Sequence, residues 1–220
     1  MKTLERRLGL VGVISISMGA MLGSGLFVLP GLATALTGPS VWLAYVVAGF
    51  LVLPAALSKS ELATAWPVSG GTYVYIDRTF GPLAGTVAGL GLWASLLLKS
   101  AFALVGFGAY LSVLADIAIL PTSLVLLAAV MGLNVLGVRK VSKVQTVVVL
   151  IAVVCLTVLA FFALTKMDTS LLEPAFEQGA TGFLATVSFV YISYAGVTKV
   201  AAIAEEVKAP ERNLPLGILL

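Results

Sequence analysis

Apolar residues form long blocks along this chain, and charged residues gather in the short segments between them. A helix that crosses a bilayer needs about 20 mainly apolar residues. Six blocks are therefore predicted to span a membrane, although the fourth is short. They cover about 8–34, 41–65, 83–114, 121–136, 144–164 and 182–203. A seventh apolar block runs from 214 to 220, so we expect a seventh span cut short and a chain that is a fragment of a longer protein.

Composition supports a polytopic all-α membrane protein that forms one transmembrane domain over residues 1–220. The chain is 60% hydrophobic and only 10% charged, with a mean hydropathy of +1.12, whereas soluble proteins average about 25% charged residues. Its net charge of +3 is spread between apolar blocks, which argues against a nucleic-acid partner. It has no histidine, one cysteine (Cys155) and no recognisable nucleophile–base, phosphate-loop or metal-ligand pattern, so we expect neither an enzyme nor a bound cofactor.

The basic residues predict the orientation. With the N-terminus inside, ten of the 13 Lys and Arg residues fall in cytoplasmic segments, only Lys166 lies outside, and Lys99 and Lys199 lie within spans. Such a bias is typical of cytoplasmic loops. We therefore expect a multi-pass protein of the cytoplasmic membrane with a cytoplasmic N-terminus.

Small and flexible residues interrupt two of the predicted spans near their centres. The first contains Gly23, Ser24 and Gly25, which invite a helix to unwind where unpaired backbone is most costly. The free N–H groups and positive helix end of such a break suit a small carboxylate. The sixth span has small residues at 193–196. Two interrupted helices at corresponding positions indicate an inverted-repeat transporter with a site between them.

Three stretches together resemble the amino acid permeases of the amino acid–polyamine–organocation superfamily: 23–27 with Pro30, 58–82, and 205–215. The resemblance implies a LeuT-like fold of two inverted five-helix repeats, in which the first and sixth helices are unwound around the substrate. It also implies amino acid transport by alternating access, coupled to a proton or Na⁺ or run as exchange. This chain would hold the first repeat and the start of the second.

The resemblance also implies site residues. Ser24 and Gly25 would receive the substrate carboxylate, and the backbone of Met21 and Gly23 would surround the break; close helix packing is the competing role for these glycines. On the sixth span, carbonyls and pocket walls would come from Ile192, Tyr194, Ala195 and Gly196, and Ser100 matches a pocket-lining position. Neither interruption contains an acidic residue, which favours a neutral amino acid.

Lys99 stands near the middle of the third span, where a lysine costs roughly 3 kcal/mol. Two roles are open: a structural one, by snorkelling or hydrogen bonding, and a functional one, as a charge that titrates or fills a cation site during transport. Some family members carry a lysine on the fifth span, but none occurs here between 144 and 164. Lys99 or Lys199 could take its place.

Two other classes of protein compete with the transporter. An amino acid-binding membrane sensor would keep the site without moving its ligand, whereas a purely structural helical bundle would not need broken helices. The sequence leaves the identity of the amino acid, the coupling ion and the oligomeric state open.

Overall fold

The computed structural model describes residues 6, 8–135, 137–166, 168, 176–194 and 196–219, and its regular structure over these residues is helical. This confirms the all-α prediction. The α-helices are α1 (Leu10–Phe27), α2 (Leu29–Thr37), α3 (Val41–Ala65), α4 (Thr72–Phe80), α5 (Pro82–Ala115), α6 (Ile119–Val135), α7 (Val138–Thr165), α8 (Gly179–Tyr191), α9 (Gly196–Ala202) and α10 (Pro210–Leu219). Short 3₁₀ turns are η1 (Gly38–Ser40), η3 (Ile192–Tyr194) and η4 (Ala204–Glu206).

Among the residues that the structure describes, five helical stretches are long and apolar enough to cross a membrane: Leu10–Phe27, Leu29–Ala65, Pro82–Ala115, Lys140–Thr165 and Gly179–Ala202. The 17-residue α6 is shorter but also apolar. Large apolar side chains face outward on these helices; Trp93 on α5 is 64% exposed and Phe161 on α7 is 67% exposed. Exposed apolar surface on this scale is unfavourable in water and favourable against lipid tails.

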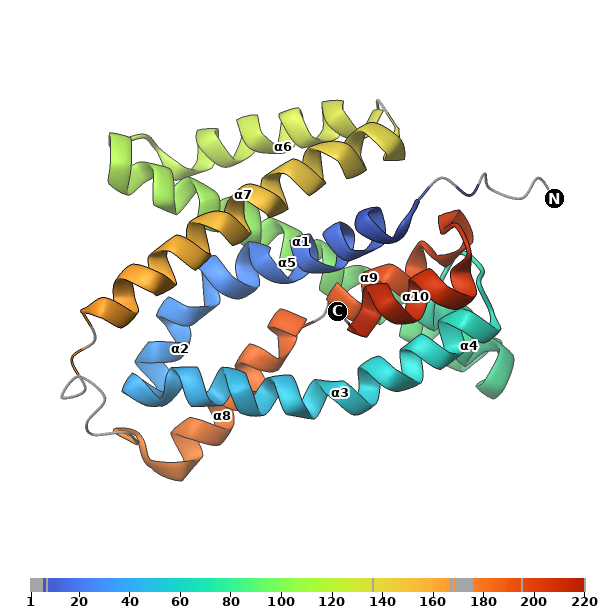
Figure 1. Cartoon of the computed structure of the whole chain (residues 1–220), viewed down its shortest axis with the longest axis horizontal. Coiled ribbons are helices and arrows are strands. Elements are labelled where there is room, and N and C mark those ends of the chain that lie inside the picture. The colour runs from blue at the N-terminus through green and yellow to red at the C-terminus, as the bar shows by residue number, and fades with distance from the viewer. Residues whose placement is uncertain are drawn as a thin grey trace.

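α1 and α2 run obliquely through the middle of the molecule (Figure 1). α7 packs against α1 from one side, and α6 lies beyond it, in contact with α5 and α7. α3 and α8 pack together near the opposite edge, where α8 also contacts α2. α9 and α10 complete the packing around the start of α1. α1 is therefore the central helix, with neighbours from both the early and the late parts of the chain.

Helix boundaries differ from the sequence expectation in the first and fifth predicted spans, and the sixth span, 182–203, also divides, into α8, η3 and α9. The first predicted span, 8–34, divides into α1 and α2, and α2 continues to Thr37, where Gly38 turns the chain with φ +68°. The fifth predicted span, 144–164, lies within the longer α7, which begins at Val138. The turns that α7 adds before 144 carry polar residues that pack on α1, such as Ser142, which is 8% exposed and whose Oγ would lie 3.2 Å from a Cβ at Gly12. Hydropathy alone does not include such residues in a span.

Backbone pairing ties the start of the chain to the segment before α10. The Leu8 N–H donates to the Glu206 carbonyl at 2.9 Å, and the Lys208 N–H donates to the Leu8 carbonyl at 2.8 Å. Leu8 and Val207 are both buried beneath this bridge. They belong to a cluster of buried apolar side chains that we name the α1–α10 cluster: Leu8, Val13, Ala56, Ala63, Tyr75, Val200, Ala201, Ala204, Val207, Leu214 and Ile218.

Tyr75 brings the one hydroxyl into the α1–α10 cluster. Its side chain is 4% exposed, and its hydroxyl has no hydrogen-bond partner among the described groups. Burial raises the pKa of Tyr75, so the phenol stays neutral. A buried hydroxyl without a partner costs about 1–3 kcal/mol, which makes this cluster less stable than its apolar packing alone would suggest.

We predict that Gly217→Ala destabilises the fold. A Cβ at Gly217 would lie 3.0 Å from Val13 Cβ, and Val13 is fully buried. Overpacking of this kind costs about 1–3 kcal/mol, and each kcal/mol lowers the melting temperature by about 2–4 °C. Thermal unfolding of the purified protein in detergent measures the effect. Gly91→Ala on α5 is the matched control, since nothing lies within 4 Å of the added atom; equal melting shifts in both variants would contradict the packing.

Candidate functional site

α1 is interrupted at Gly23. The backbone there has φ −54° and ψ −113°, whereas helical ψ is near −42°. Beyond this point the Ser24 carbonyl accepts the Val28 N–H at 3.2 Å, so helical pairing resumes in a second half-helix. Ser24 and Gly25 are buried at its start, whereas Gly23 is exposed. This confirms the predicted interruption of the first span.

The sixth predicted span is also interrupted. α8 ends at Tyr191, the chain continues as the tighter turn η3, and α9 begins at Gly196. Ala195, one of the predicted site residues, lies outside the described residues. The change from α-helical to 3₁₀ pairing alters which carbonyls are bonded within the helix. The second prediction of an interrupted helix is therefore confirmed as well.

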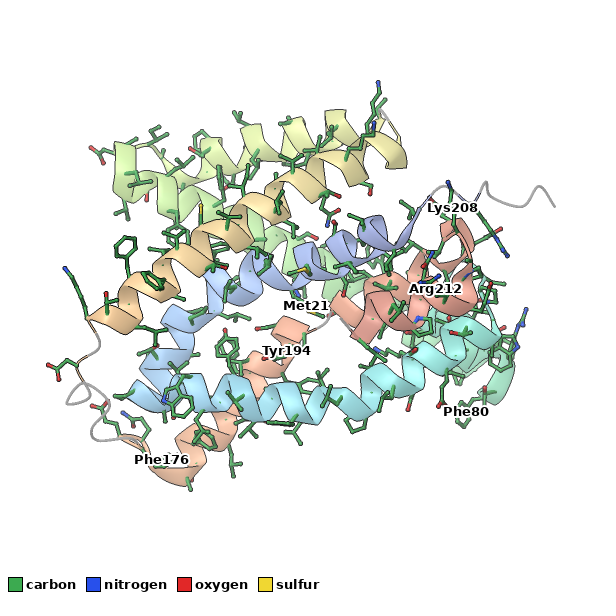
Figure 2. All side chains as sticks on the ribbon, viewed as in Figure 1. Met21, Phe80, Phe176, Tyr194, Lys208 and Arg212 are labelled. Carbon is green, nitrogen blue, oxygen red and sulfur yellow. The ribbon has the colours of Figure 1, made fainter. Side chains whose placement is uncertain are left out.

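The two interruptions lie against each other. A Cβ on Gly25 would lie 2.9 Å from Ser193 Cβ and 3.1 Å from Ser193 Cα, so the contact requires a glycine. A Cβ on Gly196 would collide with the Ser17 carbonyl oxygen and would lie 2.7 Å from Met21 Cγ. Figure 2 shows Met21 and Tyr194 near each other, where α1 and the end of α8 approach. The structure thus brings Met21, Gly25 and Gly196 together.

Hydroxyl groups from two other positions bind the Gly25 carbonyl. Tyr45 on α3 donates to it at 2.7 Å, and Ser193 of η3 donates to it at 3.3 Å. Tyr194 in turn donates to the Tyr45 carbonyl at 2.9 Å. Ser193 is 5% exposed, so its hydroxyl is largely screened from solvent. Both breaks are therefore connected to α3 through side-chain hydroxyls.

A cavity of about 310 Å³ opens beside the α1 break. Its size falls at the lower end of small-molecule pockets. Gly23 and Ser24, two of the predicted site residues, lie on its wall. The other lining residues come from the end of α1 and from α5: Phe27, Val28, Ala103, Phe107 and Tyr110. The Tyr110 hydroxyl donates to the Phe27 carbonyl, which joins the two walls. The lining is apolar apart from the Ser24 and Tyr110 hydroxyls and the backbone at Gly23.

Other predicted residues are absent from the described wall of this cavity. Ile192 is 53% exposed, and Tyr194 is half-buried beside α3. Ser100 is exposed, and its hydroxyl donates to the Leu96 carbonyl of its own helix at 2.8 Å. The structure does not bring Ser100 to the cavity, and its binding role stays a prediction.

Lys99 reaches the second interruption. Its ammonium donates to the Ile192 carbonyl at 3.3 Å. Lys199 on α9 is half-buried and lies close enough to repel Lys99 electrostatically. A cation bound to a carbonyl at the C-terminal end of α8 also interacts favourably with the helix dipole. The structure therefore places Lys99 at the α8–α9 break, which Lys199 follows by one turn as the sequence predicts.

Sequence reasoning missed most of the side chains that complete the site. Tyr45 and Ser193 bind the Gly25 carbonyl, and Phe107 and Tyr110 line the cavity. The sequence marks these residues only weakly. Tyr45 is an isolated hydroxyl-bearing residue in the apolar stretch of α3, and Tyr110 lies in the apolar stretch of α5. Which face of such helices points inward cannot be read when nearly every position is apolar.

The arrangement offers main-chain groups and hydroxyls rather than reactive side chains. Within the described ranges, no group of three Asp, Glu or Cys residues could hold a metal ion, and the chain has no histidine. The N–H groups that begin the second half of α1 can bind an anion. The carbonyls at the end of α8 can accept hydrogen bonds from an ammonium group. Together these groups suit a small zwitterion.

Comparison with known proteins gives a consistent result. The family model described as "Amino acid permease" matches residues 12–220. The "Branched-chain amino acid permease BcaP" of Bacillus subtilis is 28% identical over 239 residues, covering 99% of this chain and 51% of the relative. The "Cationic amino acid transporter 7, chloroplastic" of Arabidopsis thaliana is 30% identical over 242 residues, covering 98% of this chain and 41% of the relative.

The chain thus spans about half the length of the curated relatives it matches. The family match extends over both helix interruptions and over the predicted spans, apart from the first four residues of the first span. With several apolar helices in the structure, it identifies a multi-pass membrane protein. The chain belongs to the amino acid permease family.

Proposed function

We propose that this chain takes part in carrying a neutral amino acid across the cytoplasmic membrane by alternating access. The observation that supports this most strongly is the contact between Gly25 and Ser193, which joins two interrupted helices beside a cavity. A helix that only packs in a membrane gains nothing from such a break, because its freed main-chain groups need new partners. A substrate with complementary charges provides those partners.

The amino acid would bind with its carboxylate at the N–H groups of Ser24 and Gly25 and at the Ser24 hydroxyl. The positive end of the second half-helix favours the negative charge there. Its ammonium group would face the Tyr194 carbonyl of the second break, beside the Ile192 carbonyl that Lys99 already binds. Met21, Gly23 and Gly196 would supply the backbone and close packing around it, and Ala195 would complete the wall.

A neutral substrate fits the cavity better than a charged one. Among the described residues, no Asp, Glu, Lys or Arg lines its wall, which is formed mainly by Phe27, Val28, Ala103 and Phe107. An unpaired charged side chain on such apolar surface would lose its hydration without compensation. The names of similar proteins include both branched-chain and cationic amino acids, and the apolar lining favours the former class here.

Alternating access would use the first half of α1. This half-helix rests on α7, α9 and α10, and the backbone bridge between Leu8 and the 206–208 segment holds its start. With the N-terminus in the cytoplasm, as the charge bias predicts, this bridge closes the cytoplasmic end. Opening toward the cytoplasm would break its two hydrogen bonds and expose the α1–α10 cluster.

Reconstitution into lipid vesicles tests the function. Protein expressed from its natural reading frame should accumulate radiolabelled leucine or valine against empty-vesicle controls, and should take up arginine and glutamate far less. An imposed proton or Na⁺ gradient, or amino acid preloaded inside, identifies the driving force. Binding without uptake under every gradient would favour a sensor, and neither binding nor uptake of any amino acid would refute the proposal.

Ser24→Ala should weaken leucine binding. A hydrogen bond to a charged group contributes about 1.5–3 kcal/mol, so the dissociation constant should rise about 10- to 100-fold. Scintillation proximity binding in detergent measures this. Ser188→Ala is the matched control, because that hydroxyl bonds to Leu184 of its own helix. Unchanged leucine affinity in Ser24→Ala would contradict binding of the substrate carboxylate at Ser24.

Lys99 and Lys199 are proposed to supply the charge that couples transport. Replacing Lys99 or Lys199 by Ala should change the pH profile of leucine uptake in at least one variant, because a titrating group at the α8–α9 break is lost. Lys140→Ala, on the exposed start of α7, serves as the control. Profiles of unchanged shape in both Lys99→Ala and Lys199→Ala would leave these lysines a structural role only.

A further inference from the structure

Three hydroxyl groups connect both helix interruptions to one position on α3. Tyr45 donates to the Gly25 carbonyl at 2.7 Å, and Ser193 donates to the same oxygen at 3.3 Å. Tyr194, the next residue along the chain, donates to the Tyr45 carbonyl at 2.9 Å. The bonds run from α3 to α1, from η3 to α1, and from η3 back to α3. They form a closed ring, which we name the Tyr45 ring.

We propose that Tyr45, Ser193 and Tyr194 are positioning residues that hold the two helix interruptions in one fixed arrangement. Each hydroxyl acts through a main-chain carbonyl, so it sets where backbone lies without needing to touch a ligand. The two residues that flank the contact, Ser24 and Ile192, belong to the proposed binding groups. A change in any ring member therefore reaches both ends of the bound amino acid.

Burial makes these hydrogen bonds effective. Ser193 is 5% exposed and Gly25 is buried, whereas Tyr45 and Tyr194 are half-buried. Water competes little with such buried hydrogen bonds. A buried carbonyl left without its donor destabilises the folded protein by about 1–3 kcal/mol. The Gly25 carbonyl receives two donors, so loss of one leaves it partly satisfied. The Tyr45 carbonyl receives its side-chain donor from Tyr194 alone among the described residues.

Close packing keeps the ring in register. Gly25 has no room for a Cβ against Ser193. On α3, a Cβ added at Gly49 would lie 3.2 Å from the Tyr194 hydroxyl oxygen. Gly49 follows Tyr45 by one helical turn, so both residues are on the same face of α3. On this face of α3, Tyr45 donates a hydrogen bond to α1, and Gly49 leaves space for the Tyr194 hydroxyl of η3.

The ring predicts that both interruptions loosen together when one hydroxyl is removed. Tyr45→Phe deletes a single oxygen atom and keeps the aromatic packing. Hydrogen–deuterium exchange of the ligand-free protein in detergent should then become about 2- to 10-fold faster in the α1 segment 22–28 and in the segment 190–194. Ser193→Ala and Tyr194→Phe should show the same paired effect, so the test stands if Tyr45→Phe fails to fold.

Two control variants match these changes. Tyr191→Phe removes a neighbouring phenol for which no hydrogen bond is seen within the described part of the chain, and Ser188→Ala removes a hydroxyl bonded within α8. Neither should alter exchange at 22–28. Acceleration confined to one of the two segments in the ring variants, no acceleration in either, or equal acceleration in the controls would each overturn the proposal.

A second readout rests on the proposed function and separates its failure from that of the ring. Tyr45→Phe and Ser193→Ala should each raise the dissociation constant of leucine about 3- to 10-fold. The double variant should lose more leucine affinity than the product of the two single effects, because either donor alone leaves the shared carbonyl partly satisfied. Strict additivity would contradict a shared carbonyl. If the unsubstituted protein binds no leucine, the proposed function fails, while the exchange experiment still decides the ring.

Discussion

Main-chain hydrogen bonding inside a membrane is the constraint on which this structure depends. A helix satisfies its own N–H and C=O groups, and an interruption exposes some of them where no lipid can replace the lost partners. In this chain the carbonyl beside the first interruption is bound by hydroxyls of Tyr45 and Ser193. A carbonyl of the second interruption, at Ile192, is bound by the Lys99 ammonium. The protein supplies some of the partners itself, and we propose that a bound amino acid supplies others.

Small residues allow this arrangement. Gly25 and Gly196 bring α1 within backbone contact of η3 and α9, and Gly217 does the same between α10 and Val13. Membrane helices lack the hydrophobic drive that assembles soluble cores, so close approach and polar contacts provide much of their attraction. The result is a central helix, α1, held at its start by a backbone bridge and near its end by hydroxyl groups bound to Gly25. A transporter that opens at one end needs such separable points of attachment.

Several features could be predicted from the sequence because they depend on local composition. The apolar blocks gave an all-α membrane protein, and the glycines and serine at 23–25 gave the interruption of α1. The family resemblance was confirmed by a match over residues 12–220. Contacts between segments far apart in the chain could not be predicted from the sequence. Tyr45 and Ser193 stand 20 and 168 residues from Gly25, and no periodicity marks their shared carbonyl. The rotation of α5 about its axis could not be predicted for the same reason. It leaves Ser100 exposed and turns Phe107 and Tyr110 to the cavity.

The interpretation as a carrier depends on two helix breaks that together hold the ends of an amino acid. Electron cryomicroscopy of the leucine-bound protein in lipid nanodiscs tests that arrangement directly. It does not depend on a transport assay. We predict a leucine carboxylate within about 2.7–3.2 Å of the Ser24 and Gly25 amide nitrogens, with its ammonium directed to the carbonyls at 192–194. Another apolar groove, of about 610 Å³, lies between α2 and α5, lined by Gly31, Leu32, Val105 and Val113 among others. Leucine located only in this groove, with nothing bound at Ser24, would contradict this interpretation.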